Sequence, residues 1–285
     1  MKQQIPYLFI LLLLLHAASC AQTNPLTAIP KTDTNQSANN FRLLHSIPGN
    51  YLYMNADVLD NIYLINTGNR LIKLNHKGDS VAVFNDVKKY GNPSYIDVSN
   101  PLKILVYYKN FSTVVVLDRL LVFRNSINLR KQQIFSVQAV ATSYDNNIWV
   151  FDEQDFKLKK IDEDGKLLQE STDMRLLVDT VPSPSHLYDN ENNVILYDKK
   201  RGFYMFDYYG ALKNNLPFLQ WENTAISRNT IYGFSENRLL SYELSSLTLK
   251  KYDLPPFIKD YDMIKAINGK LYLLKKDSVE IYSVQ

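Results

Sequence analysis

A short phrase of sequence recurs six times beyond residue 60, and this repeat restricts the possible folds more than any other feature. In each copy a polar corner of Asp, Asn or Gly precedes a run rich in Ile, Val, Leu and Tyr, as in residues 60–65 and 146–151. Counted from the first strand residue of each copy, at 62, 103, 148, 194, 230 and 270, the spacings are 41, 45, 46, 36 and 40 residues. Apolar residues alternate with a period of two and no long stretch keeps helical spacing, so we predict an all-β chain.

The length of the repeat predicts the architecture, because a four-stranded propeller blade takes about 40 to 45 residues. The last unit offers three strand patterns, near residues 263–267, 270–274 and 278–284, and lacks an outer strand. Residues 41–47 form a further strand pattern with no blade of its own, and Phe41, Leu43 and Ile47 would share one face of it. We therefore predict a six-bladed β-propeller over residues 41–285, closed by the N-terminal strand (residues about 41–47), which completes the last blade.

The second half of each unit also repeats, as a strand, a polar turn and another strand. Ile161-Asp162-Glu163-Asp164-Gly165-Lys166 places an Asp-Gly-Lys turn after an apolar strand. This arrangement resembles the six-bladed β-propellers of the NHL-repeat type. The resemblance extends over about residues 41 to 285 and implies an architecture only, because fold does not fix function.

The first 40 residues have a different character and predict export. One cation, Lys2, precedes an 11-residue apolar run at 5–15 and small residues before Cys20, which is the layout of a secretory signal. Residues 17–20 resemble a bacterial lipoprotein signal, which implies cleavage before Cys20 and acylation of this single cysteine. The alternative is ordinary cleavage after Ala21, which discards the cysteine. We thus divide the chain into a signal peptide (1–19), a flexible polar tether (20–40) and the propeller (41–285).

Charge and histidine content exclude several function classes. With 32 Lys and Arg against 29 Asp and Glu, the chain is too close to neutral for binding along nucleic acid. Three histidines follow the signal: His45 in the closing strand, His76 in a hairpin turn and His186 in an expected connection between blades. A zinc or iron site usually needs two or more His or Cys held together, so we predict no metal and no cofactor.

Acidic residues give only weak functional patterns. Asp162, Asp164 and Gly165 resemble the start of a calcium loop, but its closing Glu is out of register, and a polar hairpin turn is the simpler interpretation. Glycoside hydrolysis commonly uses a pair of carboxylates. In this chain the two carboxylates would lie on or beside inner strands of different blades. The candidates for such a pair are Asp57, Asp97 and Asp189.

Basic residues gather in the expected turns between the second and third strands, which lie on one face of a propeller. These residues, a candidate rim for an anionic partner, are Lys109, Lys199, Lys200, Arg201, Lys275 and Lys276. Asp152, Glu153, Asp155 and Glu236 occupy equivalent turns of other blades, so a solvated face of mixed charge is the alternative.

Our leading hypothesis is a non-catalytic β-propeller, exported and lipid-anchored in a bacterial cell envelope and facing the periplasm, that serves as an interaction platform for envelope proteins. The alternative is a glycan-binding or glycan-processing propeller with its site in the central funnel, and a third hypothesis is a sensor of a small anionic ligand. An enzyme requires convergent ionisable groups, whereas a platform requires an apolar or aromatic patch on a face or flank.

Overall fold

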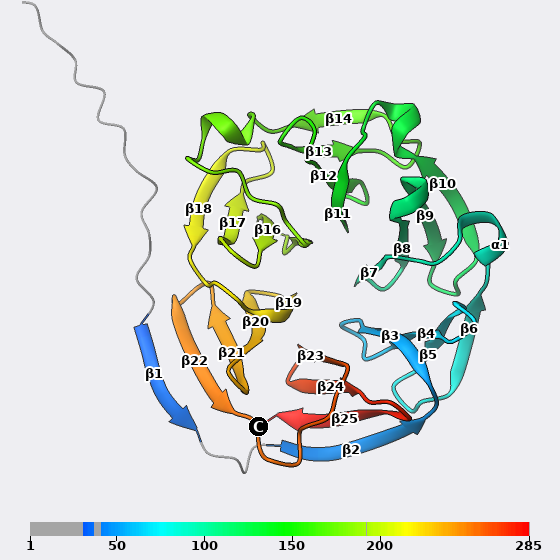
Figure 1. The fold of residues 1–285 in the computed structure, drawn as a ribbon, viewed down its shortest axis with the longest axis vertical. Helices are drawn as coiled ribbons and strands as arrows, with labels where there is room; N and C mark the ends of the chain where they lie inside the picture. The colour runs from blue at the N-terminus through cyan, green and yellow to red at the C-terminus, as the bar shows by residue number, and fades with distance from the viewer. Residues whose placement is uncertain (1–30, 37–40, 192, 285) are drawn as a thin grey trace, which may run out of the picture.

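The computed structural model describes residues 31–36, 41–191 and 193–284, and shows a ring of six antiparallel sheets around a central axis (Figure 1). Each sheet is one blade, and its first strand lies nearest the axis. Blade 1 consists of β3 (Tyr51–Ala56), β4 (Ile62–Asn66), β5 (Leu71–Leu74) and β6 (Ser80–Phe84). Blade 2 consists of β7 (Tyr95–Asn100), β8 (Lys103–Tyr108), β9 (Thr113–Asp118) and β10 (Phe123–Asn128). Blade 3 consists of β11 (Val137–Thr142), β12 (Ile148–Asp152), β13 (Lys157–Ile161) and β14 (Leu167–Glu170).

The second half of the ring repeats this pattern. Blade 4 consists of β15 (His186–Asp189), β16 (Val194–Asp198), β17 (Gly202–Phe206) and β18 (Leu212–Leu216). Blade 5 consists of β19 (Glu222–Ser227), β20 (Thr230–Ser235), β21 (Arg238–Glu243) and β22 (Thr248–Asp253). Blade 6 combines β23 (Met263–Ile267), β24 (Lys270–Leu274) and β25 (Ser278–Val284) with β2 (Phe41–Pro48). Short helices lie between strands: α1 (Val87–Tyr90), η2 (Lys109–Phe111), η3 (Leu129–Gln132) and η4 (Met174–Leu176).

The predicted architecture is confirmed. The second strands β4, β8, β12, β16, β20 and β24 begin at residues 62, 103, 148, 194, 230 and 270, the positions from which the repeat was counted. These strands are the most apolar because both of their faces pack against neighbouring blades. Each gap between adjacent blades is filled by buried side chains from both, so the core is a ring of interfaces and not one central mass.

The N-terminal strand closes the ring as predicted, since β2 pairs antiparallel with β25 (Figure 1). One detail of the prediction is wrong. The register shifts between Leu43 and His45, so that Leu44 is an extra residue in the strand. Such a bulge changes which side chains face the core. Phe41 is buried against blade 5, Leu44 and Ile47 pack towards blade 1, and Leu43 is 50% exposed.

The segment expected to be a flexible tether includes a strand. Within residues 20–40, β1 (Lys31–Gln36) pairs in parallel with β22, the outer strand of blade 5, and makes that sheet five-stranded. An outer strand has unpaired N–H and C=O groups that can accept a further strand, which explains why a polar segment is ordered there. Cys20 and the signal peptide lie outside the described residues.

Candidate functional site

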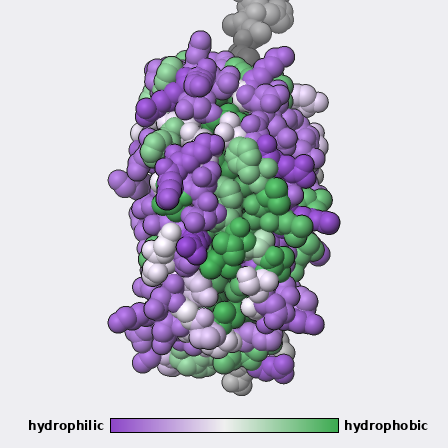
Figure 2. Space-filling model, turned by 90° about the vertical axis from the view of Figure 1, so that its right-hand side faces the viewer, coloured by the Kyte–Doolittle hydropathy of each residue, from purple (hydrophilic) through white to green (hydrophobic). Residues whose placement is uncertain are grey.

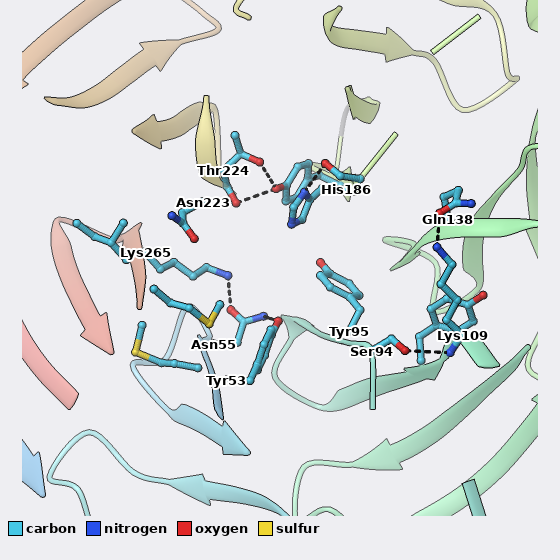
Figure 3. A pocket seen from close by; sticks show the side chains of 16 residues that line it. Tyr53, Asn55, Ser94, Tyr95, Lys109, Gln138, His186, Asn223, Thr224 and Lys265 are labelled. Carbon is cyan, nitrogen blue, oxygen red and sulfur yellow. Dashed lines mark hydrogen bonds between the residues drawn. The ribbon is translucent and has the colours of Figure 1, made fainter. Parts of the chain in front are cut away.

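The inner strands surround a cavity of about 400 Å³ that opens on the face where the second and third strands of each blade connect (Figure 3). All six inner strands contribute to it, mainly with aromatic, amide and basic side chains, together with two methionines. Lys109 reaches it from the turn after β8. The polar and aromatic side chains that line it are Tyr53, Asn55, Ser94, Tyr95, Tyr107, Lys109, Gln138, Ser185, His186, Tyr188, Asn223, Thr224 and Lys265.

Lys265, on β23, extends its ammonium group into the cavity (Figure 3). Its Nζ donates a hydrogen bond to Oδ1 of Asn55 on the neighbouring blade 1. Asn55 is itself held in one orientation, because its Nδ2 donates to the carbonyl oxygen of Ile96 at 2.8 Å. Burial lowers the pKa of Lys265 to about 8, and the negative charge of Asp97 opposes that shift. The ammonium is therefore charged at neutral pH although it lies in a partly dehydrated site.

His186 lies across the cavity from Lys265 and belongs to an aromatic group. Its ring is parallel to that of Tyr188, with centroids 6.0 Å apart, and edge-on to that of Tyr95 at 5.9 Å. The Tyr188 hydroxyl donates to the carbonyl oxygen of Thr224 at 2.7 Å, which fixes this side of the wall. Burial, followed by the positive charge of Lys265, lowers the pKa of His186 to about 4. At neutral pH the imidazole is therefore uncharged.

Some polar groups of the cavity have no partner among the described residues. The hydroxyl of Tyr95 and the side-chain amide of Asn223 face the cavity and make no hydrogen bond with the described chain. Among the described residues that line it there is no Asp or Glu. The cavity thus combines two basic side chains with uncharged hydrogen-bond donors that have no partner in the described chain. This arrangement suits a small anion.

A second cavity of about 540 Å³ opens on the opposite face and shares Asn55, Tyr95, Tyr188 and Lys265 with the first. These four residues form the narrow part of the central channel. Asp97 and Asp189 lie on the far side of it, among the lining of this second cavity. The channel is therefore basic on one side of its narrow part and contains carboxylates on the other.

The candidate carboxylates have structural partners. Asp57 accepts from the Tyr63 hydroxyl at 3.0 Å, and Asp97 accepts from the backbone N–H of Thr142 at 2.6 Å. Asp189 accepts from the Tyr208 hydroxyl at 2.8 Å and from Trp149 Nε1 at 3.2 Å. Each carboxylate joins a turn or a neighbouring blade to its own strand, which is a sufficient reason for its presence.

The three histidines in the described part of the chain do not meet. His45 and His76 are exposed in β2 and in the turn between β5 and β6, where the sequence placed them. His186 was misplaced: it begins the inner strand β15 and does not lie in a connection between blades. Among the described residues no three His, Cys, Asp or Glu side chains are grouped to hold a metal ion. Asp162 caps its hairpin turn by accepting from the backbone N–H groups of Asp164 and Lys166.

The residues of the predicted basic rim lie on one face, but several of them already pair with acidic side chains. Lys199 pairs with Glu222 at 2.7 Å, Lys275 with Glu280 at 2.7 Å and Arg201 with Asp198 at 3.8 Å. Lys200 and Lys276 are exposed and have no ion pair among the described residues. Lys109 donates to Gln138 Oε1 at 2.6 Å at the mouth of the cavity. Asp152, expected in an equivalent turn, ends β12 and is fully buried in an ion pair with Lys159.

A band of exposed apolar side chains covers the outer flank of blades 1 and 2 (Figure 2). We call it the flank band, and its members come from β6 and from the end of β9 to the start of β10. The two groups are neighbours, because Lys73 on β5 donates to the carbonyl oxygen of Arg119 at 2.8 Å. The exposed members of the flank band are Val81, Val83, Leu120, Val122 and Phe123.

Comparison with known proteins gives a fold and no family. No family model and no curated protein matches the chain. Among solved structures, the WD40 domain of Neurospora crassa Pan2 is 9% identical with a TM-score of 0.60, covering 88% of this chain and 98% of its own. Virginiamycin B lyase from Staphylococcus aureus is 10% identical with a TM-score of 0.58, covering 86% and 100%. A putative exported protein from Bacteroides fragilis is 10% identical with a TM-score of 0.55, covering 88% and 98%.

At such identities the likeness establishes the propeller fold alone, and the neighbours include both an enzyme and a WD40 domain. The resemblance to NHL-repeat propellers stays a prediction. In the part of the chain that the structure describes, no helix is long and apolar enough to cross a membrane.

Proposed function

We propose that this protein is a non-catalytic interaction platform of the bacterial cell envelope, exported and lipid-anchored, with a partner protein that covers the flank band. The observation that carries the proposal is the flank band itself (Figure 2). Soluble proteins seldom expose a large contiguous apolar surface, and those that do commonly cover it with a partner. The expected export rests on the secretory-signal pattern of residues 1–19.

The charges around the flank band indicate the chemistry of the partner. Lys88, Lys89 and Arg119 are exposed beside it, and Lys89 Nζ lies 5.4 Å from the ring centre of Phe123. Arg124 is also exposed there and pairs with Asp118 at 3.5 Å. Complementary charge at the rim of an interface favours the correct partner and speeds its association. We therefore expect an apolar segment of the partner flanked by acidic residues.

The ends of the blades offer a way for such a segment to bind. On blade 5 the edge of the outer strand pairs with an extended segment, β1, whereas the outer strands of the other five blades pair with no further strand among the described residues. Addition of a strand to an exposed edge is a common mode of peptide recognition, with backbone hydrogen bonds supplying affinity and side chains supplying specificity. On blade 1 the free edge is β6, whose Val81 and Val83 belong to the flank band.

Site-specific photocrosslinking in native membranes tests this proposal. A photoreactive amino acid placed at position 83 or 123 should capture one and the same protein, because both positions contact the flank band's partner. The same amino acid at Leu168, which is equally apolar and exposed on the outer strand of blade 3, serves as the control and should not capture it.

A second variant links the captured protein to the apolar surface. Phe123→Glu, combined with the photoreactive group at position 83, should abolish capture while leaving the melting temperature close to that of the wild type, because Phe123 is exposed. Capture that is equal at positions 83, 123 and 168, or that survives Phe123→Glu, would refute the flank band as the binding surface.

A further inference from the structure

We propose that the cavity around Lys265 binds a small hydroxylated carboxylate, whose carboxylate group contacts the Lys265 ammonium. This inference does not depend on the proposed platform function, because the cavity lies at the axis and the flank band lies on the outer surface. It rests on three features of the cavity: an ammonium without a counter-ion, free neutral donors beside it, and a lining without acidic side chains.

The first feature is the state of Lys265. Its only hydrogen bond among the described residues goes to the neutral amide oxygen of Asn55. No carboxylate of the described residues forms an ion pair with it, and the nearest acidic influence, Asp97, lies beyond the narrow part of the channel. A buried charge is costly unless it is paired, and an ammonium has three donors. An anionic ligand would supply the missing charge and occupy the donors that remain.

The second feature defines the rest of the ligand. The Tyr95 hydroxyl and the Asn223 amide face the same space as the ammonium of Lys265 (Figure 3). The uncharged imidazole of His186 hydrogen-bonds through Nδ1 with Ser185 Oγ at 2.9 Å, so its other ring nitrogen, Nε2, is the one available to a ligand. These groups both donate and accept hydrogen bonds, so they match hydroxyl groups better than a second anionic group.

The third feature is the electrostatic field of the cavity. Lys265 lies deep within it and Lys109 lies at its mouth, while the part of the chain that the structure describes contributes no Asp or Glu to its lining. A concave surface lined by one sign of charge attracts the opposite sign. Its volume of about 400 Å³ is in the range of small-molecule sites, which usually begin at about 300 Å³.

Calorimetry with a matched pair of compounds tests the inference. D-gluconate and sorbitol have the same chain of hydroxyl groups, and only gluconate has a carboxylate. We expect gluconate to bind the full-length protein saturably with one site per chain, and sorbitol not to bind. Lys265→Gln, which keeps a donor for Asn55, should weaken gluconate binding about tenfold or more, the usual loss when a charge-assisted hydrogen bond is removed.

Two further variants make the result specific to this cavity. Lys276→Gln removes the same charge from an exposed turn on the same face, and binding should be unchanged. Tyr95→Phe removes only one free hydroxyl and should weaken binding without loss of folding. The proposal is overturned if gluconate does not bind, if sorbitol binds equally well, or if Lys276→Gln weakens binding as much as Lys265→Gln.

Discussion

His186 and Lys265 show how one cavity determines the charge of both side chains. Each would be positive at mildly acidic pH in water, but burial opposes both charges, and the charge of Lys265 further opposes a charge on His186. Because a lysine begins with the higher pKa, it keeps its proton at neutral pH and the histidine loses its own. The cavity therefore has one deep positive charge and not two.

This difference predicts a dependence of stability on pH. The pKa of His186 falls from its usual 6.5 to about 4 on folding, so between these values the unfolded chain binds a proton that the folded protein does not. The free energy of unfolding should therefore fall as the pH drops from 6.5 to 4, and His186→Gln should fall less steeply over this range. Denaturant titrations at several pH values measure both slopes.

His76→Gln is the matched control for this experiment, because His76 is exposed in a hairpin turn. Its pH profile should follow that of the wild type. If His186→Gln and the wild type lose stability in parallel between pH 6.5 and pH 4, the imidazole is not held neutral by the cavity.

At the scale of the element, β2 carries the closure of the ring. It completes blade 6 from the opposite end of the chain, and its Phe41 is buried between blades 5 and 6. Full burial of such a side chain contributes about 1.5 to 3 kcal/mol, and the pairing with β25 adds the hydrogen bonds of a whole strand edge. Deletion of residues 41–47 should therefore prevent cooperative folding, as judged by thermal melting followed by circular dichroism.

Deletion of residues 21–38 is the control for this prediction. It removes β1 from the outer edge of blade 5 but leaves all six blades with four strands. The melting temperature should fall by a few degrees at most. Similar melting of the two deletion variants would show that β2 is not required for closure.

Second strands are easier to predict from the sequence than inner strands, for a physical reason. The second strands are packed on both faces, and their dense apolar runs, such as Ile148–Asp152, gave their first residues correctly. The inner strands face the channel on one side and so mix polar with apolar residues. For this reason the sequence predicts a connection where β15 begins, at His186 after two Ser and two Pro residues. The bulge at Leu44 depends on pairing with β25, which the local sequence does not specify.

The cavity was harder to predict than the fold because its residues come from all round the ring. Lys265, Asn55 and His186 belong to blades 6, 1 and 4, and no spacing in the sequence relates them. What the repeat does provide is the position of each inner strand, which begins seven to eleven residues before the second strand. Polar residues at those positions were the available signal for a channel site.

The whole molecule has two separate surfaces for binding, the channel at the axis and the flank band on the outside. A rigid ring keeps them apart, since every blade is fixed by buried contacts with both neighbours. Occupation of the channel therefore does not block a partner on the flank. The two proposals can be tested on the same protein without interfering with each other.

Attachment to the membrane is the property of the whole molecule that remains a prediction. If Cys20 is acylated, the wild type should fractionate with membranes and incorporate a radiolabelled fatty acid, and Cys20→Ala should lose both properties. The melting temperature should not change, because the substitution lies outside the propeller. Recovery of both forms in the soluble fraction, with Gln22 as the first residue by mass spectrometry, would instead establish cleavage after Ala21 and refute the lipid anchor.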